Sequence, residues 1–415
     1  MIFAKKQTNK NRKTGFPIFL VCLCVCWWLI NPLVSAQKLP EAGKKARFSL
    51  LTASPGTKVW SHYGHTGIRY NDPDDGLDIV FNYGLFDFSS PNFIGRFVTG
   101  QTDYLVGTSS YFDFLLEYRL ENRAVTEQVL NLTQQEKTRL WQALLTNIQP
   151  ENRVYRYNFF YKNCATLPRD IIEQSINGQV EYTRKPDYNS LREVIHHFTN
   201  DYPWIQYGID FALGAEADRE ANLRIQQFAP DILMHSFSTA IIRSDTAGIR
   251  PLVLEYSQPV TIDPELKEKG FPWPGPLTVM WTVFGLTGLL TILEIIKKRQ
   301  YHLLDAVLFT VAGILGCLML FLMLFSEHPA TDENYLSLWI HPFHLLFVIG
   351  LIIPAFRRKG AALYKTVNLP LQLFALAGVL FLPQTLHPAA YPLLLTLMLR
   401  SLSGSWFLFN KLKHE

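Results

Sequence analysis

Long uninterrupted apolar runs lie only at the two ends of this 415-residue sequence. Nearly all of them fall in roughly the first 36 and the last 140 residues, while the middle reads as a water-soluble domain. A run of about 20 apolar residues is long enough to cross a lipid bilayer as a helix. The chain is therefore expected to be partly embedded in a membrane and partly exposed to water.

The N-terminal apolar run has the layout of an export signal. A basic stretch at residues 5–13 precedes the apolar run Phe16–Ile30, and Val34–Ala36 supplies the small residues that a signal peptidase requires. This order predicts a signal peptide over residues 1–36, cut after Ala36. The alternative is an uncleaved anchor, because the run is nearly long enough to span a bilayer. In either case the domain that follows is exported.

The C-terminal region, residues 276–415, follows a linker at residues 263–275 and contains about five candidate membrane spans, the fourth of them short. They are roughly Pro276–Ile296, Leu303–Phe325, Leu338–Phe356, Leu369–Pro383 and Tyr391–Phe409. An all-α bundle of about five transmembrane helices is therefore expected.

Basic residues predict the orientation of these spans. Lys297–Arg299 follow the first span, Arg357–Lys359 follow the third, and Lys411 and Lys413 follow the fifth. Positively charged loops stay on the cytoplasmic side, so the segment Ser326–Leu336 and the exported domain are expected in the periplasm. The export signal and the loop charges agree on one topology, that of a multi-pass membrane protein whose exported domain lies outside the cytoplasm.

The charge distribution argues against a nucleic acid as partner. The formal net charge is +4, which is small for this length, and the basic residues are dispersed except beside apolar segments.

Only one cysteine belongs to the exported domain. Three of the five cysteines, Cys22, Cys24 and Cys26, lie in the export signal, and Cys317 lies in a span, which leaves Cys164 without a disulfide partner. A lone thiol in an oxidising compartment is either buried and inert or retained for its reactivity.

Residues 37–262 read as one exported domain of mixed α and β structure with a helical extension. β-branched and aromatic residues between turn signals predict strands, and apolar periodicity after Ser or Thr caps predicts helices. The strands are Arg47–Leu51, Gly67–Tyr70 and Asp78–Tyr83, and the helices are Ser110–Leu120, Gln134–Asn147 and Leu191–Phe198.

The residues around Cys164 predict that it lies at the start of a helix. Asn163 is a good N-cap, Pro168 is tolerated only near a helix start, and Ile171 and Ile172 supply an apolar stripe. Backbone N–H groups at a helix start favour a thiolate, so a lowered thiol pKa is expected. The same N–H groups can bind the oxyanion of an acyl-transfer intermediate.

His65 is the candidate base for this thiol. It enters a predicted strand between Gly64 and Gly67, which allow close approach of a ligand or another backbone. The next strand can present Asn82 or Asp78 to the far nitrogen of the imidazole, and a partner of this kind fixes the tautomer.

A metal site is the weaker interpretation of this region. On an extended strand, His62 and His65 point to opposite faces, and no nearby carboxylate or paired cysteine motif supports zinc. The aromatic run at residues 155–161 is expected to form core and pocket wall.

Polar side chains at the outer ends of the second and third spans are candidate substrate contacts, because ionisable groups in or beside a bilayer are often functional. These residues are His328, Asn334, His341 and His344.

Four segments resemble one known family. They read GHTGIRY around His65, FNYGLFDFSSPNF from Phe81, YRYNFFYKNCATLPRDI around Cys164, and SEHPATDEN from Ser326. Together they resemble the Bacteroidota-type lipoprotein N-acyltransferases over nearly the whole chain. The exported domain in turn looks like a permuted NlpC/P60-like (papain-like) thiol domain, because its histidine precedes its cysteine, as in the branch that includes lecithin:retinol acyltransferase.

The resemblance implies that Cys164 is the nucleophile that accepts the acyl group and His65 is its base. For the third catalytic residue we choose Asn82 by strand adjacency, with His62 as the second choice. The family pattern leads us to expect a different polar–aromatic pair where this chain has His62 and Tyr63. His62, Tyr63 and Asn163 are also candidates for substrate binding.

The function implied by the resemblance moves an acyl chain from a phospholipid, through a cysteine thioester, to the N-terminal amine of a diacylated lipoprotein. No metal and no other cofactor is required. Two rival hypotheses remain open, namely a cysteine peptidase or amidase that acts on peptidoglycan and a non-catalytic membrane scaffold that binds lipoproteins.

Overall fold

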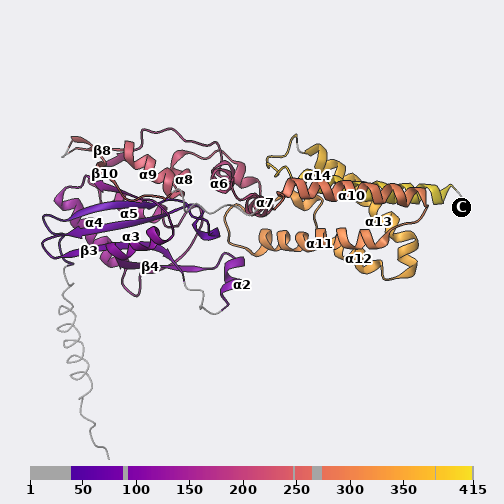
Figure 1. Cartoon of the computed structure of the whole chain (residues 1–415), viewed down its shortest axis with the longest axis horizontal. Helices are drawn as coiled ribbons and strands as arrows, with labels where there is room; N and C mark the ends of the chain where they lie inside the picture. Colours follow the sequence, from indigo (N-terminus) through magenta and orange to yellow (C-terminus); the bar gives the residue numbers. More distant parts are fainter. Residues whose placement is uncertain (1–38, 87–91, 246–247, 264–272, 379, 414–415) are drawn as a thin grey trace, which may run out of the picture. The chain divides into compact units, whose positions relative to one another are not determined.

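The computed structural model describes residues 39–86, 92–245, 248–263, 273–378 and 380–413 (Figure 1). The predicted signal peptide, residues 1–36, lies outside the described residues. The chain from Ala42 onwards forms one compact unit.

A seven-stranded antiparallel sheet forms the centre of the exported domain. Its strands in spatial order are β10 (Val253–Val260), β5 (Val125–Leu130), β1 (Arg47–Ala53), β2 (His65–Asp72), β3 (Leu77–Leu85), β4 (Asp103–Ser110) and β6 (Val154–Arg156). The three strands predicted from the sequence correspond to β1, β2 and β3. Each is longer than predicted, because each pairs with a neighbour on both sides.

Helices and a small second sheet complete the exported domain. The helices are α2 (Phe93–Val98), α3 (Tyr111–Leu120), α4 (Gln134–Asn147), α5 (Thr166–Ser175), α6 (Leu191–Thr199), α7 (Pro203–Ala212), α8 (Leu223–Gln226) and α9 (Pro230–Thr239), with 3₁₀ turns η2 (Val59–Ser61) and η3 (Ala215–Asp218). The second sheet contains β7 (Gln179–Glu181), β8 (Ile241–Ser244) and β9 (Gly248–Pro251).

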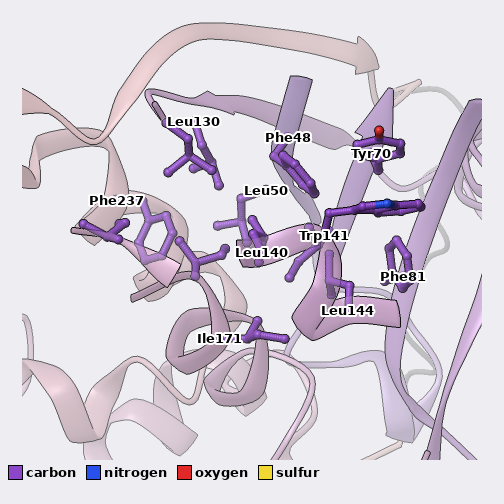
Figure 2. Packing of buried hydrophobic residues seen from close by; sticks show 14 of the residues in the cluster. Phe48, Leu50, Tyr70, Phe81, Leu130, Leu140, Trp141, Leu144, Ile171 and Phe237 are labelled. Carbon is purple, nitrogen blue, oxygen red and sulfur yellow. The ribbon is translucent and has the colours of Figure 1, made fainter. Parts of the chain in front are cut away.

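The main core lies between one face of the large sheet and the helices α4, α5 and α9 (Figure 2). Tyr70 of β2 stacks on Trp141 of α4 with ring centroids 4.0 Å apart, and Phe81 of β3 meets the same indole edge-on at 6.1 Å. Helix α4 begins with the capping box predicted from the sequence, formed by Thr133 and Glu136.

Helix α3 covers the opposite face of the sheet. Its buried side chains Phe114 and Tyr118 pack with Val80 of β3 in a separate apolar cluster. The helix starts at the Ser110 N-cap, where β4 ends, and Leu120 is its last residue. It therefore runs back along the sheet towards the end at which β4 begins.

Among its described residues, the C-terminal region contains five α-helices. They are α10 (Pro276–Ile296), α11 (His302–Phe325), α12 (Phe343–Gly350), α13 (Ala361–Gly378) and α14 (Ala390–Leu412), with a 3₁₀ turn η5 (Tyr335–Leu338) and a π-helical turn η6 (Phe356–Gly360). Among the described residues, three helical segments are long and apolar enough to cross a membrane, namely Pro276–Ile296, His302–Phe325 and Ala390–Asn410.

The predicted third and fourth spans differ from the structure. The expected span Leu338–Phe356 is α-helical only over α12, because 3₁₀ and irregular backbone precede it. The fourth helix runs from Ala361 to Gly378 rather than from Leu369 to Pro383. Hydropathy misplaced it because its buried face carries polar side chains, among them Lys365.

Buried ion pairs join four of the membrane helices. The Lys365 ammonium lies 2.9 Å from Asp305, whose carboxylate also lies 2.7 Å from Arg400, and Arg400 in turn contacts Glu294. Glu294 is in the last turn of α10 and Asp305 in the first turn of α11, so the start of α13 lies level with the α10–α11 turn. The two carboxylates and the two cationic side chains neutralise each other's charge, as buried charges require.

Candidate active site

The candidate active site lies at one end of the large sheet. The strand register places Ala53, the last residue of β1, opposite both His65 of β2 and Val125 of β5. Gly84, close to the end of β3, lies at the same end. Antiparallel neighbours thus bring together chain segments that are far apart in sequence.

Cys164 occupies the turn immediately before α5, as the sequence predicted. The Asn163 side-chain oxygen accepts hydrogen bonds from the backbone N–H groups of Ala165 and Thr166 at 2.8 and 2.9 Å. Its amide group donates to the carbonyl oxygens of Phe159 and Phe228. Every polar atom of this buried side chain therefore binds the protein backbone. Asn163 stabilises the turn and has no polar atom left for the predicted contact with a substrate.

His65 and Asn82 meet across β2 and β3. The Asn82 Oδ1 atom lies 3.3 Å from His65 Nε2, and the Asn82 amide donates to Ser109 Oγ at 3.1 Å. Because the amide nitrogen is used by the serine, the oxygen faces the imidazole and accepts the Nε2 proton. This tautomer leaves the His65 Nδ1 lone pair available as a base.

The other candidates for the third catalytic residue, Asp78 and His62, contact other groups. Both Asp78 carboxylate oxygens pair with the Arg69 guanidinium, at 2.7 and 2.8 Å. His62 lies before β2, where its Nδ1 is 3.0 Å from the Gly56 carbonyl oxygen and its ring stacks on Tyr202. His62 does not share a strand with His65, because η2 and a turn separate it from β2.

Cys164 lies beside the first residues of β2. The backbone N–H of Thr66, the residue after His65, donates to the Cys164 sulfur. Both Cys164 and His65 are partly exposed, so a substrate can reach them.

The ionisation of the pair differs from the prediction. Burial raises the pKa of the Cys164 thiol to about 11, against the opposing effects of backbone N–H donors and the Arg123 charge. Burial also lowers the pKa of His65 to about 4, although its hydrogen bond to Asn82 opposes this shift. The expected lowering of the thiol pKa is wrong because desolvation outweighs the helix start. The resting pair is a neutral thiol and a neutral imidazole at pH 7.

Tyr155 is a site residue that the sequence alone did not single out. Gly84 has a φ of +91°, and a Cβ atom placed on it would lie 3.5 Å from Cys164 Cβ and 3.9 Å from the Tyr155 hydroxyl. That hydroxyl is buried, and no described group accepts its proton. The alternation of β6 could have revealed this residue, since Tyr155 is buried between exposed Val154 and Arg156.

Arg123 and Tyr118 were also missed. The Tyr118 ring centroid lies 6.4 Å from that of His65, and the Arg123 guanidinium carbon lies 4.7 Å from the same tyrosine ring. Arg123 is buried and donates to the Ser54 carbonyl oxygen at 2.8 Å. A fixed positive charge thus lies close to the cysteine–histidine pair.

The predicted outer contacts serve the junction between the two parts of the chain. His328 Nε2 lies 2.7 Å from the Phe97 carbonyl oxygen, and the Asn334 amide donates to the Phe211 carbonyl oxygen at 2.8 Å. Both residues anchor the outer loop on the exported domain. The structure does not bring them to Cys164.

His341 and His344 lie among the membrane helices. Their rings stack at 4.0 Å, His341 Nε2 is 3.1 Å from Asn368 Oδ1, and His344 Nδ1 is 2.9 Å from the Tyr364 hydroxyl. The structure does not bring them to Cys164 either.

Tyr63 packs in an aromatic cluster with Phe159, Phe198 and Phe228. Within the described ranges, no group of three or more His, Cys, Asp or Glu side chains is placed to hold a metal ion.

The fold and the site define a class of protein, in which an exported α+β domain carries a Cys–His–Asn arrangement and is joined to a helical membrane region. Family models match both parts. The model for the Lnb N-terminal periplasmic domain matches residues 42–197, and the model for the Lnb transmembrane domain matches residues 267–412. The chain belongs to the Bacteroidota lipoprotein N-acyltransferase family, and it is a membrane protein with a periplasmic domain. Searches of curated proteins and of solved structures gave no match.

Proposed function

We propose that this protein transfers an acyl chain from a phospholipid to the N-terminal amine of diacylglyceryl-cysteine lipoproteins, through a thioester on Cys164. The observation that carries the proposal is the placement of Cys164, His65 and Asn82 at one end of the sheet, with His65 Nε2 bound to Asn82 and the backbone N–H of Thr66, the next residue, donating to the Cys164 sulfur. Membership of the lipoprotein N-acyltransferase family supports the substrates.

In the first half-reaction, His65 Nδ1 takes the thiol proton while the Cys164 sulfur attacks the ester carbonyl carbon of the phospholipid. The carbonyl oxygen of the ester becomes an oxyanion, for which the Tyr155 hydroxyl and the Cys164 backbone N–H are the candidate donors. When the tetrahedral intermediate collapses, the C–O bond breaks and His65 gives its proton to the departing lysophospholipid oxygen. A thioester and a neutral imidazole remain.

In the second half-reaction, the free amine of the lipoprotein attacks the thioester carbonyl. His65 accepts a proton from the attacking nitrogen and returns it to the Cys164 sulfur as the C–S bond breaks. The amide product leaves and the neutral thiol is restored. Each half-reaction therefore begins and ends with a neutral imidazole and with an un-ionised sulfur, as a thiol or a thioester.

The position of the site supports lipid substrates. The sheet end that carries His65 also carries Arg156, which pairs with Glu327 of the outer loop at 3.1 Å, and Gln101 donates to the same glutamate at 2.9 Å. Two substrates that are both held in a bilayer need a catalytic site next to that bilayer.

We further propose that the exported domain is a permuted papain-like domain, and that α12 and α13 complete five membrane crossings of the inner membrane. The order of His65 before Cys164 supports the permutation. The ion pair between Lys365 and Asp305 supports the crossings, since it brings the start of α13 level with the α10–α11 turn.

The test is reconstitution of the purified full chain with phospholipid and a diacylated lipopeptide. Mass spectrometry should detect a triacylated product with the wild type and none with Cys164→Ser, because the alcohol is far less ionised than the thiol. An N-acetylated lipopeptide should not react. Cleavage of muropeptides instead would establish the peptidase, and binding of the lipopeptide without any product would establish the scaffold.

A further inference from the structure

Four large apolar side chains are exposed close together at the end of the exported domain that carries the candidate active site. We call them the apolar rim, and they are Val59, Trp60, Leu120 and Ile262. Exposed apolar groups that gather in one place mark an interaction surface, whereas scattered ones do not.

Contacts between neighbouring residues hold three parts of the rim together. Lys58, next to Val59 and Trp60, pairs with Glu121, next to Leu120, at 2.7 Å. The Asn122 side chain exchanges two hydrogen bonds with the Asp263 backbone, which fixes Ile262 beside the end of α3. Three segments distant in sequence therefore contribute to one surface.

This surface lies at the active-site end of the sheet. Arg123 follows the α3–β5 turn and donates to the carbonyl oxygen of Ser54, next to the strand residue opposite His65. The Arg123 guanidinium and the His65 ring both contact Tyr118 of α3. The rim and the cysteine–histidine pair thus share the end of α3.

The same end faces the membrane region. Ile262 and Trp273 lie on either side of the segment that leads to α10 at Pro276. The Trp204 indole of α7 donates to the Pro274 carbonyl oxygen at 3.1 Å, so the exported domain contacts the chain at the entrance of the first membrane helix. Tryptophan is enriched where a protein meets the bilayer interface.

We propose that the apolar rim inserts into the outer leaflet of the membrane and forms the lipid entrance to Cys164. The partner is the lipid surface itself, namely the acyl chains and interfacial region of phospholipids. The inference rests on the proposed function for its substrate. A phospholipid that rises towards the sulfur would expose its methylene groups to water, and an apolar surface continuous with the bilayer lowers that cost.

Two residues of α3 provide a matched test. Leu120 belongs to the rim and is 79% exposed, while Phe112 is 71% exposed at the opposite end of the same helix. Eight residues of helix separate them by about 12 Å. A glutamate is accommodated at either position without disturbing the core, but only at Leu120 would it face lipid.

Acyl-enzyme formation is measured on the full chain with two donors, a long-chain phospholipid in nanodiscs and a short-chain phospholipid below its micellar concentration. Leu120→Glu should slow acylation by the bilayer donor about tenfold or more and leave the soluble donor unaffected, while Phe112→Glu should change neither rate. The proposal would be overturned if both variants slowed acylation by the bilayer donor equally. It would also be overturned if Leu120→Glu slowed acylation by the two donors equally.

A second readout does not depend on activity. Fluorophores on Leu120→Cys and on Phe112→Cys, in a background of Cys164→Ser and Cys317→Ser, are exposed to lipids that carry a quencher. Strong quenching at 120 and little at 112 is expected, and the reverse contradicts the inference. If neither donor acylates the wild type, the proposed function is wrong, and the quenching still shows whether the apolar rim enters the bilayer.

Discussion

Removing the Tyr155 hydroxyl should separate stability from catalysis. Tyr155→Phe deletes one buried oxygen beside Cys164 whose proton no described group accepts. An unsatisfied buried polar group costs about 1–3 kcal/mol, but the Gly84 N–H, which donates to the same oxygen, loses its acceptor in the variant. The two effects oppose each other, so the melting temperature should stay near that of the wild type. Loss of one oxyanion donor typically slows an acyl transfer by about 10²–10³-fold. We expect about 10²-fold here, because the Cys164 N–H remains.

The assay is quenched-flow acylation of the full chain by phospholipid, with KM and kcat determined separately. The loss should fall on kcat, because the oxyanion exists only in the transition state and the intermediate. Tyr83→Phe is the matched control, since the Asn147 amide donates to its hydroxyl at 2.9 Å. That variant should lose stability and keep its rate. A Tyr155→Phe enzyme that retains full activity, or that loses stability as the control does, would refute the reasoning.

Three further outcomes follow from the structure. The pKa of Cys164 is about 11 and that of His65 about 4, so the free enzyme should show no thiolate absorbance at pH 7. The acylation rate should stay level from about pH 6 to 9 and fall only as His65 becomes protonated towards pH 4. A bell centred on neutral pH would contradict the neutral pair. Gly84→Ala should destabilise the fold by about 1–2 kcal/mol in chemical denaturation, because its φ is +91°, while the added Cβ would stand at an ordinary contact distance of 3.5 Å from Cys164 Cβ and should leave the acylation rate nearly unchanged; a large fall in rate without loss of stability would contradict this. Arg400→Met should destabilise the protein in detergent by about 3–5 kcal/mol, since it leaves the buried Glu294 carboxylate without its cationic partner, while Asp305 keeps Lys365. A melting temperature equal to the wild type would count against the buried network.

Local signals in the sequence predicted the frame of the site. The capping box of α4, the three central strands and the turn that Asn163 holds before α5 depend on neighbouring residues, so a single sequence contains them. The N-cap of α5 itself is Ala165 rather than the predicted Asn163, because the helix begins two residues later than expected. The partnership of His65 with Asn82 was predicted because consecutive strands pair and side chains two residues apart share a face.

The remaining features depend on tertiary packing. The thiol pKa was predicted in the wrong direction because the sequence shows the helix start of α5 but not the burial of Cys164. The alternation of β6 indicates that Tyr155 is buried but not that it lies beside Cys164. Nothing near Tyr118 and Arg123 in the sequence indicates that they reach the site. The start of α13 was missed because Lys365 is neutralised by Asp305 on another helix, so a charge that normally ends a hydrophobic span lies inside one.

The central claim is that Cys164 carries the acyl chain. Intact-protein mass spectrometry of the full chain incubated with phospholipid alone tests it directly, without any acceptor. The account predicts a mass increase of one acyl group located on Cys164, release of an equal amount of lysophospholipid, and reversal by neutral hydroxylamine, which cleaves thioesters. An unmodified Cys164 under conditions in which the same preparation triacylates a lipopeptide would contradict it.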